Sequence, residues 1–176
     1  MGFSMPCWRV ASTLAMAALL GGCGLGETPE RAEILVVRRA ASDSLEITQQ
    51  LRFSEHMRET LDNGIPLRLA YRIDWCDRRR GEGQVIELRY SPLSRDYRMR
   101  RLADGEDRRF SRSSALFAAL DRVRLPVKGD IPDCGGQISV ALDLTSLPTP
   151  LRFPAFLEPS QWRLVSPEHA WSAAQP

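Results

Sequence analysis

One stretch of the chain, 65–75, alternates strictly between apolar and other residues. Side chains alternate between two faces only in an extended strand, so the apolar residues share one face. Those residues are Ile65, Leu67, Leu69, Tyr71, Ile73 and Trp75. A strand with a single apolar face is typical of an antiparallel sheet that is buried on one side. We therefore expect this strand at the centre of a sheet whose apolar face the rest of the chain covers.

Shorter alternating segments lie on both sides of the central strand. They predict strands at 33–39, 45–53, 85–90, 97–100 and 138–144, and a last edge strand at 162–165. Most connections between these segments are too short for parallel crossovers. The expected fold is mainly β: an antiparallel β-sandwich or curled sheet with two short flanking helices.

Two helices are expected between the strands. The first begins after the cap Ser54, turns Met57 and Leu61 inward, and ends at Asn63-Gly64. The second begins after Ser111 or Ser113 and stops before Pro126. Its apolar stripe would consist of Leu116, Phe117, Leu120 and Val123.

The stretch 147–151 carries two prolines, Pro148 and Pro150. Because proline disfavours the helical region for the residue before it, we expect this stretch to be extended.

The N-terminus has the features of a secretory signal. Arg9 precedes an apolar run of 11 residues, 10–20, which is too short to cross a bilayer as a helix. Leu20-Gly21-Gly22-Cys23 resembles the lipobox of bacterial lipoproteins, which implies cleavage before Cys23 and its acylation. Ordinary cleavage after Ala15-Met16-Ala17 is the alternative. We therefore expect a signal peptide at 1–22, a tether at 23–32, a domain at 33–166 and a flexible tail at 167–176.

The resemblance to a lipoprotein signal implies a protein of the bacterial cell envelope, on the periplasmic side and anchored by lipid. Gly24 after the cysteine favours the outer membrane over the inner. The chain has 24 basic and 22 acidic residues, and this near-neutral balance gives no reason to expect a nucleic-acid partner.

Several segments along the domain resemble DUF4390, a family of uncharacterised bacterial envelope proteins. They are Leu51-x-Phe53-Ser54, Leu61 to Leu67, Tyr90 to Arg98, Phe110-Ser111, Leu142-Asp143-Leu144-x-x-Leu147-Pro148-x-Pro150-Leu151, and Trp162. Unlike the family pattern, the loop after the central strand carries arginines rather than several tryptophans. The resemblance implies a secreted or anchored envelope protein and brings no known activity or catalytic residue.

Two cysteines remain outside the N-terminal segment, Cys76 and Cys134. An even pair in an oxidising compartment is most simply a disulfide. The bond would close a loop of 58 residues and contribute about 4 kcal/mol in the chain-entropy model. Two free thiols too far apart to meet are the alternative. Two cysteines without nearby histidine lack the ligand spacing of a metal site, so we expect no metal and no cofactor.

The sequence offers no catalytic constellation. His56 and His169 are the only histidines, and both are expected at the surface rather than in a held triad. The carboxylates are scattered over turns, and no glycine-rich phosphate loop is present. We therefore expect a non-catalytic module, with an envelope hydrolase or another enzyme with an unrecognised site as the alternative.

Arginines are the residues with functional character. Arg78, Arg79 and Arg80 are expected at a loop tip. Arg68 and Arg72 share the outer face of the central strand, and Arg98 and Arg100 share the outer face of the strand expected at 97–100. These arginines form either surface ion pairs or a surface for an envelope protein or an anionic lipid. Our candidates for partner contact are Arg78, Arg79, Arg80, Leu147, Pro148 and Pro150.

Overall fold

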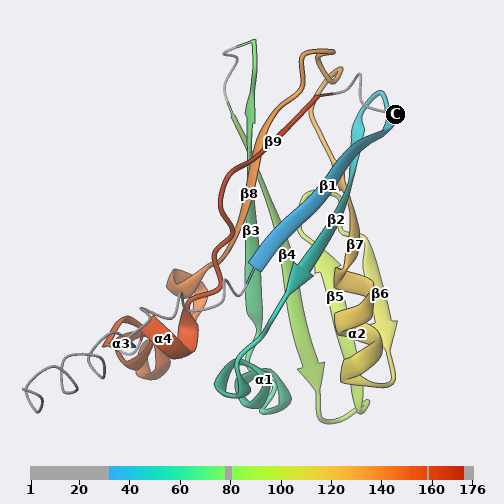
Figure 1. Ribbon diagram of the computed structural model, residues 1–176. Coiled ribbons are helices and arrows are strands. Elements are labelled where there is room, and N and C mark those ends of the chain that lie inside the picture. The colour runs from blue at the N-terminus through green and yellow to red at the C-terminus, as the bar shows by residue number, and fades with distance from the viewer. Residues whose placement is uncertain (1–31, 78–80, 158, 173–176) are drawn as a thin grey trace, which may run out of the picture.

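The computed structural model describes residues 32–77, 81–157 and 159–172, and they form two antiparallel sheets (Figure 1). The first is three-stranded, in the order β1-β2-β7; the second is six-stranded, in the order β6-β5-β4-β3-β8-β9. The sheets face each other across one apolar core. The expectation of a mainly β, antiparallel fold with short helices is confirmed.

The six-stranded sheet is built around β3 (Leu67–Trp75), which pairs with β4 on one side and β8 on the other. Its other strands are β4 (Glu82–Ser91), β5 (Asp96–Arg101), β6 (Asp107–Phe110), β8 (Gly136–Leu142) and β9 (His169–Trp171). The five apolar residues of the alternating stretch that lie within β3 are buried, whereas Ile65 precedes the strand and is half-buried. The expected face of the central strand is therefore correct.

The three-stranded sheet consists of β1 (Ala32–Ala41), β2 (Ser44–Leu51) and β7 (Arg122–Pro126). β1 and β2 form the expected first hairpin, with two irregularities of register along β1. β7 replaces the end of the expected second helix. Val123 fits the helical stripe in spacing, yet it lies in β7 opposite Ile47, because pairing with β2 buries it. The helical assignment of Val123 was wrong.

Short helices close the end of the molecule away from the disulfide (Figure 1). They are α1 (Glu55–Asp62), α2 (Ser113–Leu120), the 3₁₀ turn η1 (Leu144–Ser146), α3 (Thr149–Leu157) and α4 (Pro159–Trp162). α1 matches its prediction: Met57 N donates to the Ser54 hydroxyl at 3.1 Å. Gly64 follows the helix with φ of +80°, a conformation that favours glycine. α2 begins instead after Arg112, without a side-chain cap.

Three expectations for the C-terminal part were wrong. The stretch 147–151 is not extended throughout, because α3 begins at Thr149, and Pro150 is tolerated in the first turn, where no intrahelical donor is required. Trp162 ends α4, and Val165 makes only an isolated bridge to Ala141, so 162–165 is not a strand. The edge strand is β9, in the stretch assigned to a flexible tail.

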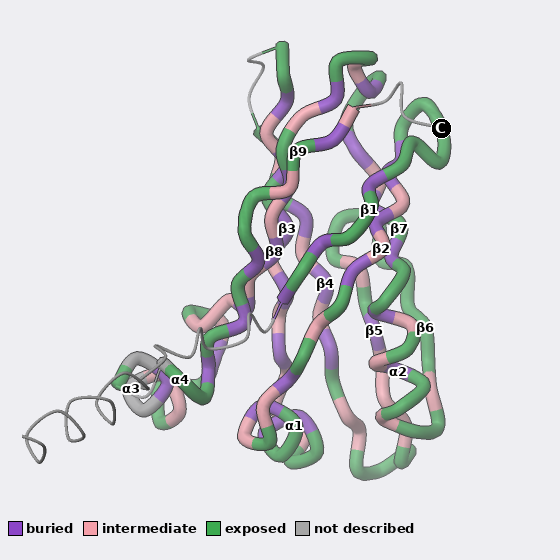
Figure 2. The backbone as a smooth tube through the Cα atoms, in the orientation of Figure 1, coloured by how far each residue is buried: buried purple, intermediate pink, exposed green. Residues whose placement is uncertain are grey.

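The core lies between the sheets, and along the central strands buried positions alternate with half-buried or exposed ones (Figure 2). A few polar contacts cross it. Gln49 Nε2 of β2 donates to the Tyr71 hydroxyl of β3 at 2.7 Å, and to the carbonyl of Leu120 at 2.8 Å. Gln84 Nε2 of β4 donates to the carbonyl of Pro126 at 2.8 Å. Because buried polar groups are costly without partners, these bonds set how the two sheets face each other.

A disulfide joins Cys76, just after β3, to Cys134, just before β8, with a Cα–Cα distance of 6.0 Å. The backbone also closes this end, since Cys76 N donates to the carbonyl of Gly135 at 3.1 Å. The expected Cys76–Cys134 bond is thus present. A structural disulfide indicates an oxidising compartment outside the cytoplasm. Among the described residues, no helix is long and apolar enough to cross a membrane.

Candidate functional site

The structure describes only some of the residues proposed from the sequence. Cys23 and the loop Arg78-Arg79-Arg80 lie outside the described residues. Leu147 is 1% exposed and packs in the core, whereas Pro148 and Pro150 are exposed at the start of α3. The two prolines are therefore accessible to a partner, and Leu147 is not.

The two histidines are half-buried and lie in different parts of the fold. His56 of α1 stands edge-on to Trp162, with 5.2 Å between the ring centroids, and His169 lies on β9. Within the described ranges, no three His, Cys, Asp or Glu side chains are grouped in a way that could hold a metal ion.

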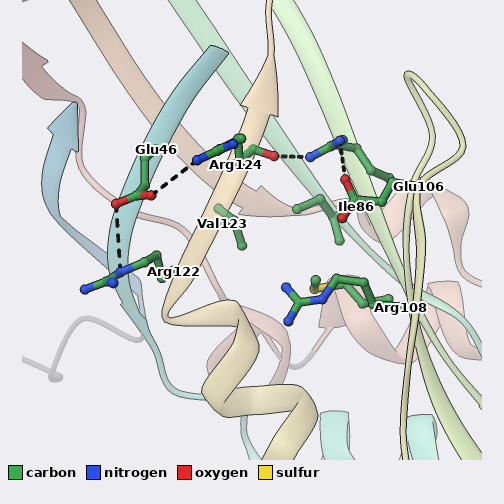
Figure 3. A pocket seen from close by; sticks show the side chains of 9 residues that line it. Glu46, Ile86, Glu106, Arg108, Arg122, Val123 and Arg124 are labelled. Atoms are coloured by element: carbon green, nitrogen blue, oxygen red, sulfur yellow. Dashed lines mark hydrogen bonds and ion pairs between the residues drawn. The ribbon is translucent and has the colours of Figure 1, made fainter. Parts of the chain in front are cut away.

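A hollow of about 160 Å³ opens between the edge strand β7 and the strands β4 to β6 (Figure 3). Its walls are Glu46, Ile86, Met99, Arg101, Glu106, Arg108, Arg122, Val123 and Arg124. Arg122 and Arg124 share Glu46 at 3.9 and 4.0 Å, and Arg108 lies over the ring of Phe110 at 5.3 Å. The hollow is rich in arginine, but most of that charge is met by groups of the chain itself.

Arg101 is the most fully paired arginine of this region, and its side chain is only 14% exposed. It donates to Asp104 and Glu106 in the turn after β5, and to the carbonyl of Arg124 across the gap between the sheets. The hydrogen bond from Arg101 holds the pKa of Asp104 below its usual value. Arg101 therefore ties β5 to β7 and is not free for a ligand.

The outer face of the six-stranded sheet carries two neighbouring rows of charged side chains. In the first, which we call the alternating row, Arg68, Glu87, Arg100 and Asp107 stand opposite one another on β3, β4, β5 and β6. Basic and acidic residues alternate along it, and Arg68 Nε lies 2.8 Å from Glu87 Oε2. Opposite charges in facing positions stabilise a sheet, so this row is neutralised internally.

The second row, which we call the arginine row, consists of Arg89, Arg98 and Arg109. Arg89 of β4 faces Arg98 of β5, and Arg98 faces Arg109 of β6. Among the described residues, Arg89 and Arg109 make no ion pair, and Arg98 has only Asp96 at 3.8 Å. Arg98 Nε is also shielded from solvent without a hydrogen-bond partner in that part of the chain. The row thus places three positive charges side by side.

The turn between β4 and β5 lies next to the arginine row. Leu93 in this turn is fully exposed, at 100%, and Arg95 takes a positive φ of 53°. The turn is held to α1, because the Tyr97 hydroxyl donates to Asp62 at 2.8 Å. An apolar tip on a fixed hairpin is therefore presented beside three arginines.

The match to a family model covers most of this architecture. Residues 30–172 match the domain of unknown function DUF4390. The chain belongs to the DUF4390 family. No curated protein and no solved structure matches the chain. The matched range includes both sheets of this DUF4390 domain, from the first described residue of β1 to the end of β9.

The sequence pattern places Arg98 and Arg100 of the DUF4390 domain together on one face, but it does not reveal the arginine row. Finding the row requires the register of three strands, and β6 was not expected at all because its four residues, 107–110, lack an alternating apolar pattern. The spacing of Arg89 and Arg98 about the β4–β5 turn was a usable signal, since a hairpin sets its own register.

Proposed function

We propose that this DUF4390 protein is a membrane-tethered, non-catalytic module of the bacterial cell envelope that binds an anionic partner. The lipobox-like stretch ending at Cys23 supports the tether, and the disulfide supports a place outside the cytoplasm. The partner is a lipid or a protein of the envelope.

One observation carries the binding part of this proposal: among the described residues, the arginine row has a single ion pair, between Arg98 and Asp96 at 3.8 Å, for three arginines. Like charges in facing positions of a sheet are destabilising, by about 0.2–1 kcal/mol per pair. The adjacent alternating row shows that the same strands can carry arginines with acidic neighbours. A bound anion would supply the charge that the arginine row lacks, with hydrogen bonds suited to carboxylate or phosphate.

In-cell photocrosslinking tests the proposal. A photoreactive amino acid replaces Ser91, which lies on the same outer face, opposite Asp96. A second site at residue 79, which lies outside the described residues, tests the candidate contacts Arg78, Arg79 and Arg80. We expect a reproducible lipid or protein adduct from residue 91, identified by mass spectrometry.

Two charge-matched variants make the result specific. The row variant carries Arg89→Gln, Arg98→Gln and Arg109→Gln. The matched variant carries Arg38→Gln, Arg52→Gln and Arg163→Gln, which remove three exposed arginines that make no ion pair among the described residues. Loss of the adduct in the row variant alone supports the proposal. Absence of any adduct from both sites contradicts it, and turnover of an envelope substrate by the purified protein would favour the hydrolase alternative.

A further inference from the structure

We propose that the end of the molecule bearing the β4–β5 turn docks on an anionic phospholipid surface. Leu93 enters the headgroup region, and Arg89, Arg98 and Arg109 face the lipid phosphates. This inference rests on the proposed function and names the partner of its arginine row.

The turn has the composition of an interfacial anchor. Leu93 is fully exposed, and its neighbours Pro92, Ser94 and Arg95 are also exposed. A single exposed leucine is ordinary on a protein surface. This one stands at the tip of a hairpin with three arginines behind it, of which Arg98 alone has an ion pair among the described residues, to Asp96. Apolar and electrostatic contributions therefore act on the same surface.

The spacing between the tip and the arginines fits the depth of a membrane interface. Ser91 and Asp96 are the last facing pair before the turn. Arg89 and Arg98 face each other two residues farther from the turn on each strand. At a rise of about 3.3 Å per residue, the row lies roughly 10 Å behind the tip. Apolar groups of interfacial segments penetrate about 5–10 Å, so arginines at that distance reach phosphate level.

The path of the chain favours a membrane at this end of the molecule. β1 begins at Ala32, which pairs with Leu51 only a few residues before α1. α1 contacts the hairpin through Asp62, and the β4–β5 turn lies at the opposite end from the β1–β2 turn (Figure 1). A chain from Cys23 to Ala32 spans at most about 30 Å when fully extended. An anchor at Cys23 would hold the domain close to the lipid surface and raise the local concentration of headgroups around it.

A lipid surface accounts for both features without any matching pocket for Leu93, which a protein partner would have to supply. Each basic residue near an anionic surface contributes about a fivefold gain in docking, so the row supplies roughly 100-fold. The attraction weakens with salt, because charges are screened beyond roughly 10 Å at moderate ionic strength. Docking of this kind therefore depends on anionic lipid and on ionic strength.

The test uses the full chain in vesicles. A fluorophore is attached at Ser94→Cys, beside the tip, or at Lys128→Cys, in the exposed segment after β7. The vesicles contain either phosphatidylglycerol or only phosphatidylcholine, together with a nitroxide-labelled lipid that quenches a fluorophore within the interface. We expect quenching at residue 94 with phosphatidylglycerol, its loss with phosphatidylcholine or high salt, and none at residue 128.

The same variants identify the cause of docking. The row variant lowers the ratio of docked to undocked protein roughly 100-fold, while the matched variant, with the same loss of charge, leaves it near the wild-type value. Leu93→Asp also abolishes quenching and leaves the fold intact, since the side chain makes no core contact. Equal losses in the row and matched variants would overturn the inference, because net charge alone would then explain the binding.

A second outcome separates this inference from the proposed function. If residue 94 stays in water on phosphatidylglycerol vesicles while residue 91 still crosslinks to a protein in cells, the partner is an acidic protein. Lipid docking is then wrong and the binding module stands. If neither quenching nor an adduct is found, both proposals fail.

Discussion

The alternating row and the arginine row lie side by side on the same strands, and they solve the problem of charge on a sheet in different ways. In the alternating row, each basic side chain of β3 and β5 faces a carboxylate, and Arg68 is within 2.8 Å of Glu87. In the arginine row, three positive side chains face only one another across β4, β5 and β6. The alternating row is neutralised within the domain, and the arginine row is the one for which we propose an anionic partner.

This difference separates charge that serves the fold from charge that is available for binding. Counting arginines does not make that distinction, because both rows contain two or more of them. The two kinds of charge are distinguished by whether facing residues neutralise each arginine, because a guanidinium that is already paired has few donors free for a ligand. The comparison can be tested by changing one row into the other and by measuring what the core beneath both contributes.

The largest effect is expected from the core under the rows. Leu69 is fully buried in β3, directly after Arg68, and faces Ile86. Leu69→Ala should lower the free energy of unfolding by about 2–5 kcal/mol, because it leaves a cavity. Arg72→Ala is the control on the same strand: Arg72 pairs with Asp74 on the exposed face and should contribute about 0.5 kcal/mol or less. Urea unfolding compares the two variants. Equal losses of stability would show that the face of β3 bearing Arg72 is buried as deeply as the face bearing Leu69.

Glu87→Arg turns the alternating row into a second row of like charges. The change removes the partner of Arg68 and places three arginines in facing positions. We expect the free energy of unfolding to fall by about 1–2 kcal/mol, the sum of a lost pair and added repulsion. Glu87→Gln, which removes the pair without adding repulsion, should give the smaller part of that loss. Two variants of equal stability would mean that facing charges on this sheet do not interact.

Arg109→Glu makes the opposite change, since it gives Arg98 a facing carboxylate. Stability should rise by about 0.2–1 kcal/mol, while docking on phosphatidylglycerol vesicles should fall. Chemical denaturation and the quenching at residue 94 measure the two effects on the same protein. If Arg109→Glu is destabilised, or docks as well as the wild type, the two rows do not differ in the way proposed.

The smallest effect concerns Asp104, the partner of Arg101. The hydrogen bond from Arg101 lowers the pKa of Asp104, so the ionised form is favoured in the folded state. Its contribution is therefore present above the ordinary pKa of an aspartate and is lost as the pH falls through the lowered value. Asp104→Asn should cost a few tenths of a kcal/mol at neutral pH, because the side chain is partly exposed, and less near pH 3. A cost that does not change with pH would contradict this pairing.

The sequence predicts the fold where one pattern excludes the others. Strict alternation over residues 67–75 fits only a strand, and Ser54 and Gly64 delimit α1 through local capping alone. It fails where two patterns coincide. Val123 continues a helical spacing from Leu120, yet pairing with β2 places it in β7. The prolines near residue 148 fit an extended segment and the first turn of a helix equally well.

The candidate site was less predictable than the fold, because it depends on register across three strands. The sequence shows that Arg98 and Arg100 share a face, but not that Arg98 faces two arginines while Arg100 faces two carboxylates. That difference comes from the pairing of β5 with β4 and β6, and β6 has too few apolar residues to predict. The cysteine pair was predictable because the compartment limits what two such residues do.

The Cys76–Cys134 bond also makes a covalently closed ring of the chain between the two cysteines. That ring contains β4, β5, β6, α2 and β7, and with them the exposed turn at Leu93 and Arg95. Exposed turns are where proteases cut first. A single cut after Arg95 would open the ring without releasing either part, since the disulfide still joins the segments on both sides. The nicked protein would separate into two fragments only after reduction, so the domain can lose a peptide bond at this exposed turn and remain one molecule.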